Sequence, residues 1–174
     1  MNINDDDFTL FALPAQHALE RSALDARWRQ LQTEVHPDRF ASQGAAAQRI
    51  AMQWSVRVNE AYQRLKDPLR RAAYLCELRG VAVDAERNTA MPAAFLMQQM
   101  QWRETLDEAD SLTDVERIDA EVAGTERRML ADLASRLDGA GDTVGAAAQV
   151  RALMFVTRFR QDLERRLETL ETTR

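Results

Sequence analysis

Cysteine is nearly absent from this chain of 174 residues, which contains only Cys76. A single cysteine cannot form an intramolecular disulfide and cannot supply the thiolates of a zinc site. Because Cys76 lies among apolar residues on an expected helix, we expect a buried, inert thiol rather than a reactive one. Histidine is also scarce, and His17 and His36 are too few for a histidine-based metal site. We therefore expect no metal and no cofactor.

Long apolar runs are missing as well. No segment reaches membrane-spanning length, and the acidic, polar residues 1–7 do not resemble a signal peptide. We expect a soluble, cytoplasmic protein with no membrane partner. The net charge is −5 and the pI is about 5.2, with arginines dispersed along the chain. This balance argues against a nucleic-acid partner.

Glycine and proline are few, with six and four residues, and no stretch alternates with the period of a strand. The residues that dominate, Ala, Leu, Glu, Gln and Arg, are all good helix formers. The sequence therefore predicts an all-α protein. An apolar content of 45% is sufficient for a buried core.

A short polar break, His36-Pro37-Asp38, separates two segments with strong helical periodicity. One apolar face is predicted on each segment, formed by Leu24, Trp28, Leu31 and Val35 before the break and by Ile50, Trp54, Val58, Ala61 and Leu65 after it. Two amphipathic helices joined by a short connection pack antiparallel, and Pro37 ends the first of them. We therefore expect His36 and Asp38 at the exposed tip of a helical hairpin.

The remaining chain divides into further helical segments. An apolar turn is expected at residues 8–13, and a helix at 69–79 that ends at Gly80. Residues 81–92 lack helical periodicity and are the predicted linker between a domain at 1–80 and a domain at 93–174. The second domain is expected to contain three helices. The first covers residues 93–109, the second begins at a capping box at residues 113–116, and the third covers residues 143–170. Three amphipathic helices with short turns predict an antiparallel three-helix bundle.

Some apolar residues of the predicted bundle do not fit its core. Phe95, Trp102, Leu106 and Ala109 fall within roughly 60° of each other on a helical wheel, whereas Leu96, Met97 and Met100 centre roughly 150° away, beside Glu104. Phe155 lies roughly 110° from the stripe of its own helix. These residues either pack against another part of the chain or form an exposed contact surface for a partner. Methionine adapts to irregular partner surfaces, which suits the second alternative.

Catalysis by the tip is a weak hypothesis. His36 and Asp38 could form an acid–base pair, but an exposed tip lacks the dry, concave surroundings that tune a catalytic pKa. The sequence contains no glycine-rich phosphate loop and no Gly-x-Ser-x-Gly elbow. We therefore predict no catalytic residues in this chain.

The segments around the tip resemble a J domain. Residues 28–40 (WRQLQTEVHPDRF) resemble its second helix and loop, and residues 59–65 (NEAYQRL) its third helix. Residues 67–75 (DPLRRAAYL) and 8–14 (FTLFALP) also fit. In the second half, residues 94–100 (AFLMQQM) and 103–108 (RETLDE) are similar to the C-terminal domain of HscB-type co-chaperones of iron–sulfur cluster assembly.

The resemblance implies two partners, which are an HscA-like ATPase chaperone of the DnaK class and an IscU-like scaffold protein. It implies that the chain stimulates the ATPase of the chaperone and delivers the scaffold to it. The implied chaperone-binding residues are His36, Pro37, Asp38, Arg39, Arg29 and, as a weaker candidate, Arg27. The implied scaffold-binding residues are Leu96, Met97, Met100, Arg103, Glu104 and Phe155.

The sequence departs from the family pattern at two points. Its second helix is poor in lysine, and Arg39 stands where lysine is common. Some eukaryotic relatives carry an N-terminal cysteine-pair metal site, which this chain lacks. Two other hypotheses stay open at this point: a general J-type co-chaperone for unfolded proteins, and a structural helical adaptor with an inert tip.

Overall fold

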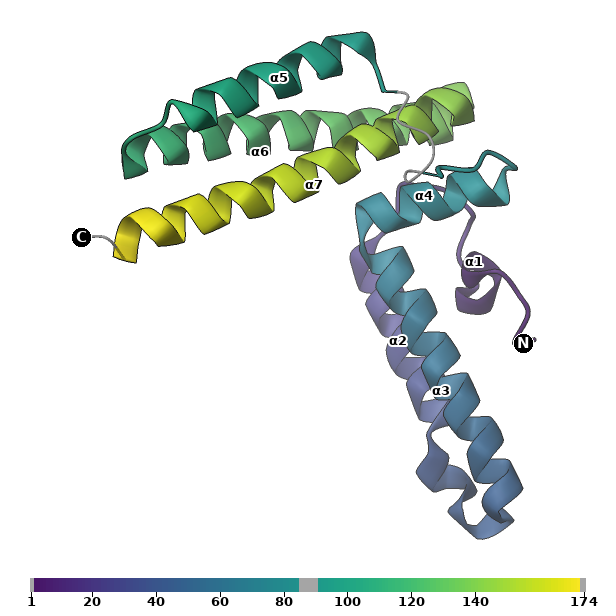
Figure 1. The fold of residues 1–174 in the computed structure, drawn as a ribbon. Coiled ribbons are helices and arrows are strands. Elements are labelled where there is room, and N and C mark those ends of the chain that lie inside the picture. The colour runs from purple at the N-terminus through teal and green to yellow at the C-terminus, as the bar shows by residue number, and fades with distance from the viewer. Residues whose placement is uncertain (1, 85–90, 173–174) are drawn as a thin grey trace. The chain divides into compact units, whose positions relative to one another are not determined.

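The computed structural model describes residues 2–84 and 91–172, and this part of the chain is helical without strands. The all-α prediction is therefore confirmed. The helices, shown in Figure 1, are α1 (Asp7–Phe11), α2 (Arg21–Val35), α3 (Ala45–Lys66), α4 (Pro68–Leu78), α5 (Ala93–Asp107), α6 (Leu112–Ala134) and α7 (Thr143–Thr172). Two shorter elements are the 3-10 helix η1 (Pro37–Gln43) and the π-helical turn η2 (Ser135–Ala140).

The chain forms two compact units, Met1–Leu75 and Cys76–Arg174, with the division inside α4. Residues 76–84 are tied to the second unit, because Arg79 Nη1 donates to the Leu137 carbonyl (2.6 Å) and Arg151 Nη1 donates to the Val83 carbonyl (3.1 Å). The boundaries drawn from the sequence at 1–80, 81–92 and 93–174 remain predictions. Residues 85–90 of the predicted linker lie outside the described residues.

The first unit is built on the antiparallel hairpin of α2 and α3 (Figure 1). Leu24 and Leu31 of α2 pack in the core with Val58 and Leu65 of α3, and all four are fully buried, as the periodicity predicted. Apolar burial of this kind contributes about 1.5–3 kcal/mol per large side chain. The core of this hairpin therefore holds α2 and α3 together along the length that they share.

Ile50 is an exception to the predicted core face, because its side chain is 56% exposed. Ser55 Oγ donates to the Val35 carbonyl (3.2 Å), so α2 ends level with Ser55. Ile50 precedes Ser55 by five residues on α3. Because α3 runs antiparallel to α2, Ile50 lies about 7.5 Å beyond the end of α2. The wheel position was right, but beyond α2 the element that packs on α3 is the short η1, which has no buried residue.

α1 packs on the hairpin through buried aromatic residues and one buried carboxylate. Phe8 and Phe11 are fully buried. The carboxylate of Asp7, also fully buried, pairs with Arg57 Nη1 (2.7 Å) and Arg64 Nη1 (2.8 Å) of α3. A buried charge is tolerated only when it is compensated, so these two arginines fix α1 on α3.

The second unit is a bundle in which α5, α6 and α7 lie side by side (Figure 1), and the predicted antiparallel arrangement is confirmed. Its core consists of buried residues from all three helices, among them Phe95, Trp102, Val115, Ile118, Val122, Val156, Phe159 and Leu163. Arg160 of α7 pairs with Asp119 (3.2 Å) and Glu126 (2.9 Å) of α6. The bundle is thus held by an apolar interior and a bridging arginine at its edge.

The two ends of α6 add two details to the bundle. α6 begins at Leu112 and is capped by Ser111, whose hydroxyl accepts from the Asp114 N–H (3.2 Å), so the cap lies two residues before the predicted Thr113. The helical path also continues through η2, and Gly141, with φ of 66°, ends it in the left-handed region that favours glycine.

Candidate functional site

The tip His36-Pro37-Asp38 lies where α2 ends. His36 has an extended backbone, and its Nδ1 accepts from the Asp38 N–H (3.3 Å) and lies 3.6 Å from Asp38 Oδ2. Pro37 takes the first position of η1, where its fixed φ is favourable and its missing N–H costs no hydrogen bond. The side chains of His36 and Asp38 remain 55% and 91% exposed. The tip therefore presents an imidazole and a carboxylate to solvent, as predicted.

Arg39 holds the tip in place rather than extending freely from it. Its Nη1 donates to the Thr33 carbonyl (3.0 Å), one of the last carbonyls of α2, which have no partner inside the helix. A cation at a helix C-terminus also interacts favourably with the helix dipole. The Arg39 N–H in turn donates to the His36 carbonyl (3.0 Å). Arg39 thus fixes the turn that carries His36 and Asp38.

A shallow hollow of about 300 Å³ lies beside the tip and is lined by Gln32, Thr33, His36 and Arg39. Of the two predicted basic contacts on α2, Arg29 is exposed and its Nε donates to the Asp25 carbonyl (3.2 Å). Arg27 is half-buried. Of the predicted basic contacts, Arg29 and Arg39 are therefore the exposed ones.

The predicted scaffold-binding residues lie on the second unit, on α5 and α7. Leu96, Met97 and Met100 of α5 are 38%, 75% and 70% exposed, and they do not enter the core of the bundle. Phe155 of α7 is half-buried and packs on that core. We call these four residues the apolar patch. Of the alternatives left open by the sequence, the structure favours an exposed surface for Leu96, Met97 and Met100.

Arg103 brings α5 and α7 together at the apolar patch. Its guanidinium carbon lies 5.2 Å from the centre of the Phe155 ring, within the range of a cation–π contact. Glu104, the next residue along α5, is exposed. Sequence reasoning grouped these residues but missed their contact, because no local pattern links positions 52 residues apart in the chain.

Three buried aromatic rings of the bundle core, Phe95, Trp102 and Phe159, support Phe155 of the apolar patch. Phe95 meets Phe155 edge-on, with ring centres 5.9 Å apart, and Phe159 lies nearly parallel to Phe155 at 6.2 Å. Trp102 stacks on Phe159 at 5.9 Å, and its Nε1 donates to Glu121 Oε1 of α6 (2.9 Å). Aromatic pairs at these distances add stability beyond the area that they bury. The cluster therefore fixes the helices that carry the apolar patch.

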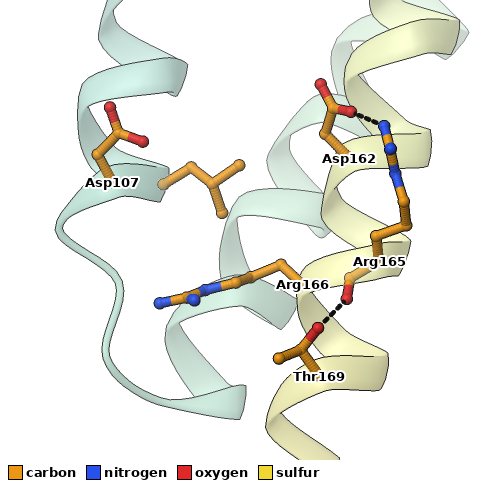
Figure 2. A pocket seen from close by; sticks show the side chains of 6 residues that line it. Asp107, Asp162, Arg165, Arg166 and Thr169 are labelled. Atoms are coloured by element: carbon orange, nitrogen blue, oxygen red, sulfur yellow. Dashed lines mark hydrogen bonds and ion pairs between the residues drawn. The ribbon is translucent and has the colours of Figure 1, made fainter.

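A second hollow, of about 470 Å³, lies between the C-terminal ends of α5 and α7 (Figure 2), and Leu106 lies among its charged lining residues. Arg165 pairs with Asp162, and Arg166 donates to the Ala109 carbonyl (3.1 Å) beyond the end of α5. Asp107 lies on the opposite wall (Figure 2). Both arginines are thus engaged within the bundle, Arg165 in an ion pair and Arg166 in a hydrogen bond to a carbonyl.

Metal-ligating side chains do not gather in the part of the chain that the structure describes. In residues 2–84 and 91–172, no group of three or more His, Cys, Asp or Glu side chains could hold a metal ion. Cys76 is fully buried, and burial raises the pKa of its thiol, as expected of an inert cysteine. None of the described helices is long and apolar enough to cross a membrane.

The chain is similar to known co-chaperones over nearly its whole length. A family described as "HSCB C-terminal oligomerisation domain" matches residues 91–164. The co-chaperone protein HscB homolog of Burkholderia thailandensis is 52% identical over 174 residues, which cover 98% of this chain and 99% of the relative. The homolog of Burkholderia multivorans is 50% identical and covers 99% of both chains.

Solved structures agree with these relatives. The chaperone HscB from Vibrio cholerae matches with a TM-score of 0.86 and 38% identity, over 95% of this chain and 99% of that chain. The human co-chaperone protein HscB shares the fold, with a TM-score of 0.87 over 95% of this chain and 84% of that chain, at 24% identity. The chain therefore belongs to the HscB family, the co-chaperones of iron–sulfur cluster assembly, as the resemblance in its sequence predicted.

Proposed function

We propose that this chain is an adaptor with two binding surfaces, which delivers an IscU-like scaffold protein to an HscA-like ATPase chaperone in the cytoplasm and stimulates its ATP hydrolysis. The observation that carries the proposal is that one chain of the HscB family exposes a polar tip on one unit and an apolar patch on the other. The chain activates the ATPase of its partner and has no turnover of its own.

The tip is the proposed contact with the ATPase chaperone. Asp38 offers an exposed carboxylate, and Arg29 offers an exposed cation on the neighbouring face of α2. Arg39 acts mainly through the turn, because its guanidinium is bound to the Thr33 carbonyl. Arg27 makes a smaller contribution than Arg29, because it is half-buried. Stimulation follows if the tip binds the hydrolysis-competent state of the chaperone more tightly than its other states.

The apolar patch is the proposed contact with the scaffold protein. Burying an exposed Leu or Met side chain in an interface contributes about 1.5–3 kcal/mol before entropic costs, so a few such anchors support a specific contact. Holding the scaffold and the chaperone on one chain also raises the local concentration of scaffold at the chaperone. The adaptor therefore needs no chemistry of its own to promote the encounter of its partners.

A titration of the chain into the ATPase chaperone, with and without scaffold, tests the proposal. We expect the ATPase rate to rise with the chain and to rise further when scaffold is present. Asp38→Asn should abolish stimulation and leave scaffold binding intact, whereas Glu60→Gln, which removes an exposed carboxylate on α3, should change neither. Normal stimulation by the Asp38→Asn variant would refute the role of the tip.

The two competing hypotheses give different results in simple assays. A general co-chaperone for unfolded proteins would bind extended, reduced peptides at the apolar patch, whereas the proposed adaptor binds the folded scaffold. A structural adaptor with an inert tip would leave the ATPase rate unchanged at every concentration. These two measurements separate the three functions without any variant.

A further inference from the structure

Among the described arginines of the bundle, Arg103 lies over an aromatic ring and forms no ion pair. Arg117, Arg136, Arg160 and Arg165 all form ion pairs within the second unit. For the Arg103 guanidinium, no hydrogen-bond or ion-pair partner is found among residues 2–84 and 91–172. Its five N–H donors are therefore available to a partner.

Arg103 does not pair with Asp107, although the spacing of the two residues would allow an ion pair. Asp107 follows at i+4 on α5, a spacing at which Arg and Asp commonly pair on a helix. The guanidinium instead crosses to α7 and lies over Phe155. A guanidinium stacked on an aromatic ring keeps its N–H edge free and loses little further freedom when that edge is bound. The contact with Phe155 thus pre-orients a planar, cationic donor.

The position of Arg103 on α5 joins it to the apolar patch. Arg103 follows Met100 by three residues and Leu96 by seven, so the three side chains share one face of the helix. It is the only basic residue of α5. The sequence of the second unit as a whole carries 19 acidic and 13 basic residues. On the α5 side of the apolar patch, an acidic group on a partner would therefore find its favourable position at Arg103.

We infer that Arg103, held by Phe155, binds a carboxylate that lies beside the apolar contact surface of the scaffold protein. This inference rests on the proposed function and names the chemistry that the partner must supply. The carboxylate would lie within about one helical turn, roughly 5 Å, of the side chain that Met100 contacts. A bidentate pair at that point fixes the register of the apolar contact, which apolar burial alone does not.

Affinity measurements on the full chain with scaffold protein test the inference. Arg103→Gln should weaken binding roughly tenfold or more, because it removes a charge-assisted, bidentate contact. Arg103→Lys keeps the charge but loses the planar fork. Its logarithm of Kd should therefore lie closer to that of Arg103→Gln than to that of the wild type. Arg127→Gln, which makes the same charge change on an exposed arginine of α6, is the matched control and should leave the affinity unchanged.

A double-mutant cycle tests the role of the ring. The Phe155→Leu chain lacks the cation–π contact. In that background, the fold loss of scaffold affinity caused by Arg103→Gln should be about two- to fivefold smaller than in the wild-type chain. Arg103→Gln should also reduce the salt dependence of scaffold binding, which a purely structural role would not do. A melting temperature will show whether the Phe155→Leu chain is folded. Arg103 is exposed, so we expect its variants to fold.

The possible outcomes separate this inference from the proposed function. If Arg103→Lys binds like the wild type, the bidentate contact is wrong. If Arg103→Gln behaves like Arg127→Gln, the carboxylate contact itself is wrong. If Met97→Ala and Met100→Ala weaken binding in the same experiment, the scaffold-binding function stands without it. If the wild-type chain does not bind scaffold at all, the proposed function itself fails.

Discussion

The methionines of the apolar patch give the sharpest test of what this surface is for. Met97 and Met100 are 75% and 70% exposed, so only about a quarter to a third of each side chain contacts its own chain. Truncating a fully buried methionine to alanine costs about 2–5 kcal/mol. Scaled to the contact that these two residues make, each truncation should lower the free energy of unfolding by no more than about 1.5 kcal/mol.

Binding of scaffold should respond more strongly than stability. If each methionine becomes buried in the complex, Met97→Ala or Met100→Ala should weaken binding by about 1–2 kcal/mol, or roughly 5- to 30-fold in Kd. Isothermal titration calorimetry measures the affinity, and urea unfolding followed by circular dichroism measures the stability. The predicted result is thus a large change in Kd with little change in the midpoint of unfolding.

Two other methionines provide the same chemical change in different surroundings. Met52→Ala removes an exposed methionine of α3, 59% exposed, and should change neither scaffold affinity nor stability by much. Met129→Ala removes a half-buried methionine that packs on the bundle core, and should lower stability with little effect on Kd. A single variant, Met97→Ala or Met100→Ala, that loses 2 kcal/mol or more of stability at unchanged affinity would assign that side chain to the core.

Further predictions concern the tip, α1 and the cysteine. Arg39→Gln should reduce ATPase stimulation several-fold without abolishing it, because the turn loses its bond to Thr33; full stimulation would show that the turn does not need this bond. Asp7→Asn should lower the free energy of unfolding by about 1–3 kcal/mol, because two arginines lose a buried counter-charge, and an unchanged urea midpoint would contradict this. The raised pKa of Cys76 leaves less thiolate at pH 8, so Ellman's reagent should react far more slowly with the native than with the denatured chain, and equal rates would refute its burial.

Much of the fold follows from the sequence because helical periodicity directly records which faces are buried. The spacing of Leu24, Leu31, Val58 and Leu65 predicted the hairpin, and all four are buried. The displacement of Met97 from the stripe of Phe95 and Trp102 likewise indicated that it does not fit the bundle core, and left packing elsewhere or an exposed surface as the alternatives. These patterns are local, so a single sequence is sufficient to read them.

Other features depend on contacts that periodicity does not encode. Ile50 has the right wheel position but stays exposed, because α2 ends before it reaches that level. Both Ser111 and Thr113 suit a helix cap, and the bond from the Asp114 N–H selects Ser111. The stack of Arg103 on Phe155 joins residues from two helices and required the structure. Sequence reasoning therefore found the surface but not the arrangement of its polar contacts.

The central claim is that the tip and the apolar patch must act from the same molecule. The direct test mixes two defective chains, Asp38→Asn, which lacks the tip carboxylate, and the double variant Met97→Ala, Met100→Ala, which lacks patch anchors. The measured quantity is the ATPase rate of the chaperone with scaffold present. We predict that the mixture stays near the rate of the better single variant, well below wild type. Recovery of the wild-type rate by the mixture would show that the two surfaces work independently and would contradict the adaptor.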